Sequence, residues 1–207
     1  GIAMLTLHNM QISGNCYKVR LAARQLGIAL RLQQYSVNGG KTRTPEFLAK
    51  NPNGRVPLLE LEDGRCLAES NAILFHLAEG SPLVPKDAWA RAKMLEWMFF
   101  EQYSHEPYVA VARFILTEAT PEARERRLPS IPELQAKGNA ALAVMETHLA
   151  KHDWFAGNAY SLADIALYAY THAAEEGGFD LARYPSLVAW LKRVAGQPNH
   201  IPLRESW

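Results

Sequence analysis

The chain has 207 residues, of which 48% are hydrophobic and 21% are charged, a composition ordinary for a globular protein that buries a core. Its 22 basic and 21 acidic side chains leave a formal net charge of +1, so charge gives no reason to expect a nucleic acid or a membrane surface as partner. No apolar run approaches the roughly 20 residues that a membrane helix needs.

The chain contains two cysteines, Cys16 and Cys66, which are too few for a disulfide framework and fit a reducing compartment. The first residues also lack the charged and apolar regions of a signal peptide. We therefore expect a protein of the cytoplasm.

The first part of the chain predicts short strands that alternate with helices. Residues 4–9 form an apolar run typical of a strand. One helix face is predicted from apolar residues spaced i, i+3, i+4 and i+7, namely Val19, Ala22, Ala23 and Leu26. Gly27 stands where a glycine commonly ends a helix. A second strand is predicted over 29–35 and a short helix over 45–51.

A hairpin is predicted next, over residues 56–69, with Asp63 and Gly64 in its turn. A further helix is expected over 70–79. Strands joined by helices and followed by a hairpin imply a small mixed sheet with helices packed against it.

The segment 80–86, which contains Gly, Ser and two Pro residues, is predicted to be a linker. Beyond it no strand is convincing. Helices are expected over 87–116 (bent at Pro107), 132–151, 160–176 and 184–198. The third opens on a capping box of Ser161 and Asp164. The sequence thus predicts an α/β domain over 4–79 and an all-helical domain over 87–207.

Two local patterns suggest other chemistry, but each is incomplete. The stretch NGGKT (38–42) looks like a phosphate loop, but Tyr35 stands where that loop needs its first glycine. His148 and His152 have an i, i+4 spacing that can hold zinc, yet a catalytic zinc site needs a third protein ligand. We expect neither a nucleotide site nor a metal site.

Ser13 and Cys16 are candidate nucleophiles by residue type. Ser13 lacks the first glycine of the G-x-S-x-G turn that exposes a nucleophilic serine. Catalysis at Cys16 would need a histidine partner that the sequence does not place.

The most informative pattern joins Val56 and Pro57 with Glu69 and Ser70. Pro57 stands at the start of a strand, and a cis bond there would turn the Val56 backbone outward as a free edge. Glu69 and Ser70 open a helix, whose first N–H groups can hold an anion. Together these features predict a peptide-like ligand along a strand edge with its carboxylate at a helix start; a plain helix cap without ligand is the alternative.

The stretches SGNCYKVRLAARQLGI, NPNGRVPLLELEDGRCLAESNAILFHLA and SLADIALYAY resemble the cytosolic glutathione transferase superfamily. Within it, the chain is most similar to serine-type bacterial members near the zeta, theta and nu classes. The resemblance covers residues 4–207. It implies a thioredoxin-like first domain with a cis Pro57, an all-α second domain, a homodimer and a role in detoxification.

Glutathione contacts follow from the resemblance, position by position. The Val56 backbone, beside Pro57, would pair with the cysteinyl moiety. Glu69 and Ser70 would hold the γ-glutamyl amine and carboxylate. Lys41, or its neighbour Thr42, would meet the glycyl carboxylate.

The resemblance also implies how the sulfur is handled. Ser13 matches the hydroxyl residue that hydrogen-bonds the glutathione sulfur, and Asn15 matches a carboxamide used near that sulfur in nu-like members. Beta-class members instead use a cysteine, which would align with Asn15. We therefore expect Cys16 to be buried and inert, and keep thiol–disulfide exchange at Cys16 as the alternative.

The electrophile pocket varies most in this superfamily, and the substrate is not identified. Tyr103, Tyr108 and Arg113 are candidates to line it; packing against a partner subunit or ordinary core is the alternative for each. The predicted function is addition of glutathione to a small hydrophobic electrophile. The alternatives are a glutathione-dependent peroxide or disulfide reductase and a non-catalytic binding module.

Overall fold

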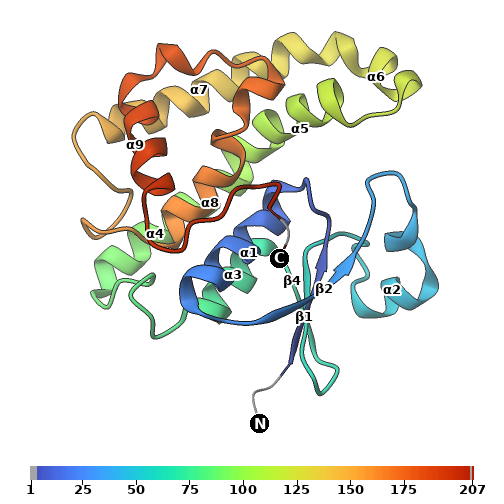
Figure 1. Ribbon diagram of the computed structural model, residues 1–207. Helices are drawn as coiled ribbons and strands as arrows, with labels where there is room; N and C mark the ends of the chain where they lie inside the picture. The colour runs from blue at the N-terminus through green and yellow to red at the C-terminus, as the bar shows by residue number, and fades with distance from the viewer. Residues whose placement is uncertain (1–3, 206) are drawn as a thin grey trace. The chain divides into compact units, whose positions relative to one another are not determined.

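The structure is a computed structural model that describes residues 4–205 and 207, and it divides into two compact units (Figure 1). The first comprises the described residues of Gly1–Ser81 and Pro198–Trp207, and the second spans Pro82–Gln197. A mixed sheet with helices forms the first unit and helices form the second, so the predicted thioredoxin-like and all-α fold class is confirmed.

The sheet of the first unit has four strands in the order β2-β1-β3-β4. They span Leu5–Asn9 (β1), Leu30–Gln34 (β2), Leu58–Glu60 (β3) and Cys66–Ala68 (β4). β1 pairs with β2 in parallel and with β3 in antiparallel, and β3 and β4 form the predicted hairpin. The hairpin turn closes with the Leu61 N–H donating to Arg65 O at 2.8 Å, and Gly64 takes the positive φ of 92° that this turn requires.

Three α-helices belong to this unit: α1 (Gly14–Leu26), α2 (Pro45–Lys50) and α3 (Ser70–Ala78). Figure 1 shows α1 and α3 side by side on one side of the sheet and α2 on the other. The core between the sheet and α1 and α3 consists of apolar side chains from both layers, among them Leu7, Val19, Ala23, Leu30, Leu59 and Ile73. Gly27 ends α1 with φ 70°, as predicted from the sequence.

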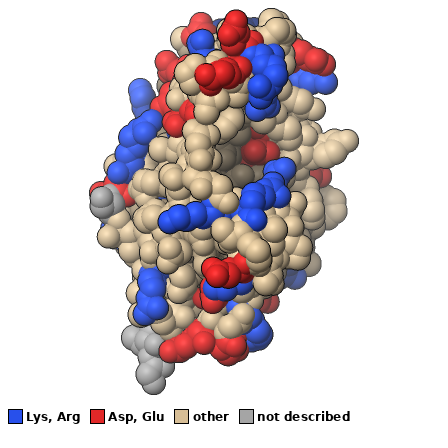
Figure 2. All heavy atoms as spheres, turned by 90° about the vertical axis from the view of Figure 1, so that its right-hand side faces the viewer, with Lys and Arg blue, Asp and Glu red and all other residues tan. Residues whose placement is uncertain are grey.

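The second unit contains α4 (Ala88–Phe100), α5 (Glu106–Thr117), α6 (Pro121–Arg127), α7 (Ile131–Leu149), α8 (Leu162–Thr171) and α9 (Pro185–Ala195). Across the described part of the chain, no helix combines the length and the apolar character needed to cross a lipid bilayer. On the face shown in Figure 2, acidic and basic side chains lie interspersed among uncharged ones, as a near-zero net charge leads one to expect.

The predicted helical stretch over 87–116 is present, since helical structure runs without a gap from Ala88 to Thr117. It is divided into α4 and α5 by a π-helical turn at Glu101–His105, and the backbone at Phe100, Glu101 and Glu106 keeps right-handed helical angles. Pro107 follows this turn directly, and it has no N–H to donate to the preceding helical turn, which agrees with the irregularity predicted near this proline. The predicted helix over 160–176 ends early, at Thr171, and α6 was not predicted.

The capping box at the start of α8 is present as predicted. The Ser161 N–H donates to Asp164 Oδ2 at 2.9 Å. The other carboxylate oxygen accepts from Trp190 Nε1 of α9 at 2.8 Å, which ties the two helices together. Asp164 is fully buried, and this burial raises its pKa to about 7 despite the hydrogen bonds that oppose the shift.

The last stretch of the chain, 198–207, is held against the first unit by buried polar side chains, although the sequence suggested that it belongs to the helical domain. The Tyr17 hydroxyl donates to Ile201 O at 2.6 Å. The guanidinium of Arg20, fully buried, donates to Leu203 O at 2.9 Å and to Asn9 Oδ1 at 2.6 Å. These bonds join α1 and β1 to a segment more than 180 residues away in the sequence.

Candidate functional site

Ser13 is the N-cap of α1. Its backbone is extended, with φ −71° and ψ 125°, and its Oγ accepts a hydrogen bond from the Cys16 N–H at 3.2 Å. Serine is favoured at this position because its side-chain oxygen satisfies one of the N–H groups that a helix start leaves unpaired. The cap uses a lone pair of the oxygen, so the hydroxyl hydrogen of Ser13 stays available to donate to a ligand.

Cys16 lies in the core of the first unit, as expected. Its side chain is fully buried, and the Met10 N–H donates to its Sγ at 3.4 Å. Burial raises the pKa of this thiol more than the hydrogen bonds to the sulfur lower it. A thiol of this kind is a poor nucleophile, because the reactive form is the thiolate.

Asn15 and Ser70, both predicted site residues, are brought together by the packing of α1 against α3. The Ser70 Oγ donates to Asn15 Oδ1 at 3.3 Å, a bond between residues 55 positions apart. Asn15 lies in the first turn of α1, and Ser70 is the first residue of α3. The starts of two helices therefore meet at one place.

Lys18 is part of the same cluster and was missed by the sequence analysis. Its side chain is fully buried, and its Nζ donates to Ser70 Oγ and to Asn71 Oδ1, each at 3.2 Å. The available signal was a lysine inside a helical run whose neighbours are mostly buried, a position where a charge needs polar partners.

Glu69, just before α3, has a backbone conformation that is unusual for a residue with a side chain. Its φ is 74° and its ψ is 113°, in a region that costs about 1–3 kcal/mol and is commonly found at functional sites. The first helical bond of α3 runs from the Ile73 N–H to Glu69 O at 3.0 Å. The N–H groups of the three residues before Ile73 therefore point out of the helix start, where an anion is favoured.

The peptide bond between Val56 and Pro57 is cis, as the resemblance implied. Pro57 is buried and Val56 half-buried, directly before β3 begins at Leu58. The structure thus places Val56 at the entry to the β3–β4 hairpin.

Lys41 and Thr42 lie in a 3₁₀ turn, Lys41–Arg43, rather than in a phosphate loop with a long helix after it. This turn approaches the loop before Val56 closely. Gly54 has φ 62°, and a Cβ built on it would lie 3.1 Å from Thr42 O, so only glycine fits there without a shift. The loop carrying Lys41 and Thr42 therefore lies next to the loop that leads to Val56.

The three candidates for the electrophile pocket have different surroundings. Tyr103 lies in the π-helical turn and is 83% exposed. Tyr108 is half-buried, with Lys137 Nζ 5.5 Å from its ring centre. Arg113 is buried, and its Nε donates to Glu176 Oε2 at 2.8 Å. The burial and ion pair of Arg113 favour the core alternative for this residue.

His148 and His152 stack with ring centres 4.3 Å apart and bind backbone oxygens. His148 Nε2 donates to Trp154 O at 2.9 Å, and His152 Nδ1 donates to His148 O at 3.1 Å. Within residues 4–205 and 207, no three His, Cys, Asp or Glu side chains gather in a way that could hold a metal ion.

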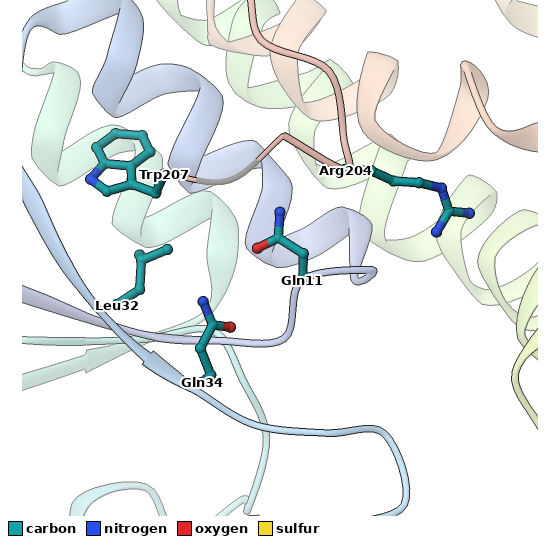
Figure 3. A pocket seen from close by; sticks show the side chains of 5 residues that line it. All are labelled: Gln11, Leu32, Gln34, Arg204 and Trp207. Carbon is teal, nitrogen blue, oxygen red and sulfur yellow. The ribbon is translucent and has the colours of Figure 1, made fainter.

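A hollow of about 490 Å³ lies on the first unit. It is lined by Gln11, Leu32, Gln34, Arg204 and Trp207. Figure 3 shows the Arg204 side chain directed away from the other four. None of these residues belongs to the predicted site.

Known proteins match this chain over both units. Family models of the glutathione S-transferase N-terminal and C-terminal domains match residues 3–79 and 96–198. The crystal structure of a glutathione S-transferase from Pseudomonas fluorescens Pf-5 is 50% identical and has a TM-score of 0.93, covering 97% of this chain and 99% of that one.

More distant relatives agree. The "Glutathione S-transferase-like protein LUC7" of a Fusarium species is 31% identical over 96% of this chain and 95% of its own length. Ure2p, solved in complex with S-hexylglutathione, is 26% identical with a TM-score of 0.80, over 94% of this chain and 95% of that one. Fold, local geometry and similarity together establish that the chain belongs to the glutathione S-transferase family.

Proposed function

We propose that this protein binds glutathione in its first unit and catalyses the addition of the glutathione thiolate to a small hydrophobic electrophile. The observation that supports this most directly is the meeting of two helix starts at the Ser70–Asn15 hydrogen bond of 3.3 Å. Helix starts favour negative charge, and glutathione brings both a carboxylate and a thiolate.

The proposed binding contacts follow the order of the ligand. Ser70 and Glu69 hold the γ-glutamyl carboxylate and amine, with the outward N–H groups of α3 adding to the carboxylate site. The Val56 backbone, next to Pro57, pairs with the cysteinyl moiety. Lys41 or Thr42 meets the glycyl carboxylate. The close approach of the Thr42 turn to Gly54 supports this assignment, because it brings the last two contacts onto neighbouring loops.

Ser13 and Asn15 are the proposed catalytic residues, and their task is to favour the thiolate. A free thiol has a pKa of about 8.5, so little of it is ionised at neutral pH. Donation from the Ser13 hydroxyl, at a helix start whose dipole favours negative charge, lowers the pKa of the bound thiol. The proton leaves to solvent, the sulfur attacks the electrophilic carbon, and a C–S bond forms as the leaving group departs or the adduct takes up a proton.

Ser13 at the start of α1 supports placing the chain among the serine-type members near the zeta, theta and nu classes. We also propose a cytoplasmic homodimer, with detoxification as its role. Trp89, Phe99 and Tyr103 on α4 and the π-helical turn are 74%, 73% and 83% exposed, and a partner subunit would cover such aromatic side chains. Light scattering on the purified protein gives the mass that tests the dimer.

The electrophile is proposed to contact the second unit, with Tyr108 as the first candidate. Tyr103 and Arg113 are also proposed as candidates. The exposure of Tyr103 and the ion pair of Arg113 favour other roles for these two residues.

The test is calorimetric binding of glutathione followed by turnover with a broad panel of electrophiles, peroxides and mixed disulfides. Conjugation of at least one electrophile is expected. Turnover confined to peroxides or disulfides would show a reductase instead. Binding without turnover of any substrate would show a binding module, and absence of glutathione binding would refute the proposal.

A further inference from the structure

Lys18 connects the start of α3 to a buried positive charge. Its side chain crosses from α1 to α3, and its ammonium donates to the side chains of the first two residues of α3, Ser70 and Asn71, at 3.2 Å each. All three residues lie in the first unit, and Lys18 has no exposed surface. The ammonium therefore stands directly behind the hydroxyl to which the proposed function assigns the γ-glutamyl carboxylate.

The Ser70 hydroxyl has a single hydrogen, so it can donate to only one acceptor at a time. A serine oxygen has one hydrogen and two lone pairs, and it accepts from Lys18 while its hydrogen donates to Asn15 Oδ1 at 3.3 Å. The bond from Lys18 fixes the position of the oxygen. Rotation about the C–O bond alone would then turn the hydrogen from Asn15 to a carboxylate arriving at the helix start.

Burial also makes the charge of Lys18 effective. A cation without water around it is poorly screened, so its attraction for a carboxylate one hydroxyl group away exceeds that of a surface lysine. The helix dipole and the outward N–H groups of α3 act in the same direction. The charge of Lys18 and the helix dipole attract an anion specifically. A neutral group at the same place would not gain this attraction.

We propose that Lys18 is a positioning residue for the γ-glutamyl end of glutathione, holding the Ser70 hydroxyl and supplying the charge that makes the start of α3 select a carboxylate. This rests on the proposed function and adds to it the source of the selectivity. The alternative is that Lys18 only fastens α1 to α3.

The test compares two ligands on two proteins. Glutathione and 4-aminobutyryl-cysteinylglycine, which lacks the α-carboxylate of the γ-glutamyl group, are titrated by calorimetry into the natural protein and into Lys18→Met. The natural protein is expected to prefer glutathione. In Lys18→Met the Kd for glutathione rises about ten-fold or more, while the Kd for the analogue changes less than about three-fold. The loss in kcat/KM is expected to exceed the loss in kcat at saturating glutathione, because the role proposed for Lys18 is in binding.

Lys151→Met removes an exposed lysine of the second unit and serves as the control, with both Kd values unchanged. If Lys18→Met does not fold, Lys18→Gln carries the test: it keeps an N–H donor, lacks the charge, and is expected to lose the preference for glutathione. Equal weakening of both ligands, or an unchanged preference, overturns the role of Lys18 while leaving glutathione binding intact. A natural protein that binds neither ligand overturns the proposed function, and the role of Lys18 with it.

Discussion

The hydroxyl of Ser70 lies 3.3 Å from the carboxamide oxygen of Asn15, which links the first residue of α3 to the first turn of α1. Neither residue is remarkable in its own segment, since each type is common at helix starts. Their meeting turns two ordinary helix starts into one polar site.

Variants of Ser13 and Cys16 distinguish the two possible reacting thiols, that of glutathione and that of Cys16. Ser13→Gly removes the hydroxyl and keeps a residue tolerated at the helix cap, so the fold loses only a few tenths of a kcal/mol. The proposed donation to the sulfur is lost, and kcat/KM is expected to fall about 10–100-fold. The pKa of bound glutathione, followed by the ultraviolet absorbance of the thiolate, is expected to rise by about 1–2 units.

Cys16→Ser is the matched variant at the neighbouring buried position, and its kcat/KM is expected to stay within about three-fold. The opposite pattern, an active Ser13→Gly and an inactive Cys16→Ser that still folds, would transfer the chemistry to Cys16.

The Ser70–Asn15 hydrogen bond predicts an energetic coupling between the two residues. In a double-mutant cycle of Ser70→Ala and Asn15→Ala, the free energies of unfolding are expected to be non-additive by about 0.5–1.5 kcal/mol. Saturating glutathione is expected to reduce this coupling, because the carboxylate takes the hydroxyl hydrogen from Asn15. Additivity within about 0.3 kcal/mol without ligand would mean that the bond contributes nothing to stability.

The raised pKa of Asp164 is expected to make the free energy of unfolding depend on pH. Its pKa is about 7 in the fold, against about 3.9 in an unfolded chain, so the folded state holds the proton more tightly. The resulting stabilisation is fully present below about pH 4 and is lost as the pH rises through about 7. Asp164→Asn removes this term, so the difference in unfolding free energy between the natural protein and the variant is expected to shrink from pH 5 to pH 8.

The exposed Asp153→Asn serves as the control, and its difference from the natural protein should not vary with pH. A constant difference for Asp164→Asn as well, measured by urea unfolding, would show that the carboxylate titrates near its ordinary pKa.

The buried hydrogen bonds of Arg20 are expected to contribute strongly to the stability of the first unit. Arg20→Leu leaves the oxygens of Asn9 and Leu203 without this donor, at about 1–3 kcal/mol for each unsatisfied group. The free energy of unfolding is expected to fall by about 2–5 kcal/mol, and the segment after Pro198 to become sensitive to proteases.

Arg24 of the same helix offers the comparison, since its half-exposed side chain pairs with Glu205 at 3.5 Å. Arg24→Leu is expected to cost less than about 1 kcal/mol. Equal losses for the two arginines would mean that the buried hydrogen bonds of Arg20 carry no special weight.

Much of the fold follows from local features of the sequence. The strands over 4–9 and 29–35, the stop of α1 at Gly27 and the capping box at Ser161 depend on residues within a few positions of one another, and all are present. The helical stretch over 87–116 is also present, with a π-helical turn directly before Pro107. That the irregularity is a π-helical turn over Glu101–His105 was not predicted.

The residues of the predicted site also fall into those that local sequence features locate and those that they do not. Ser13 at a helix start, Glu69 and Ser70 at another, and Val56 before a cis proline could be located from short patterns and from family resemblance. The electrophile contacts could not, since spacing along 99–114 does not tell which side chains turn to solvent and which, like Arg113, are consumed by an ion pair.

By itself, the sequence determined the family, the order of the strands, the order of the helices other than α6, and the residue types at the helix starts, because these depend on periodicity, caps and short motifs. Only the tertiary structure decided that Lys18 reaches Ser70, 52 positions away, and that Tyr17 and Arg20 hold the end of the chain. The physical reason is burial: a charged or polar side chain inside the core must find partners, and those partners come from whichever segments the fold brings alongside.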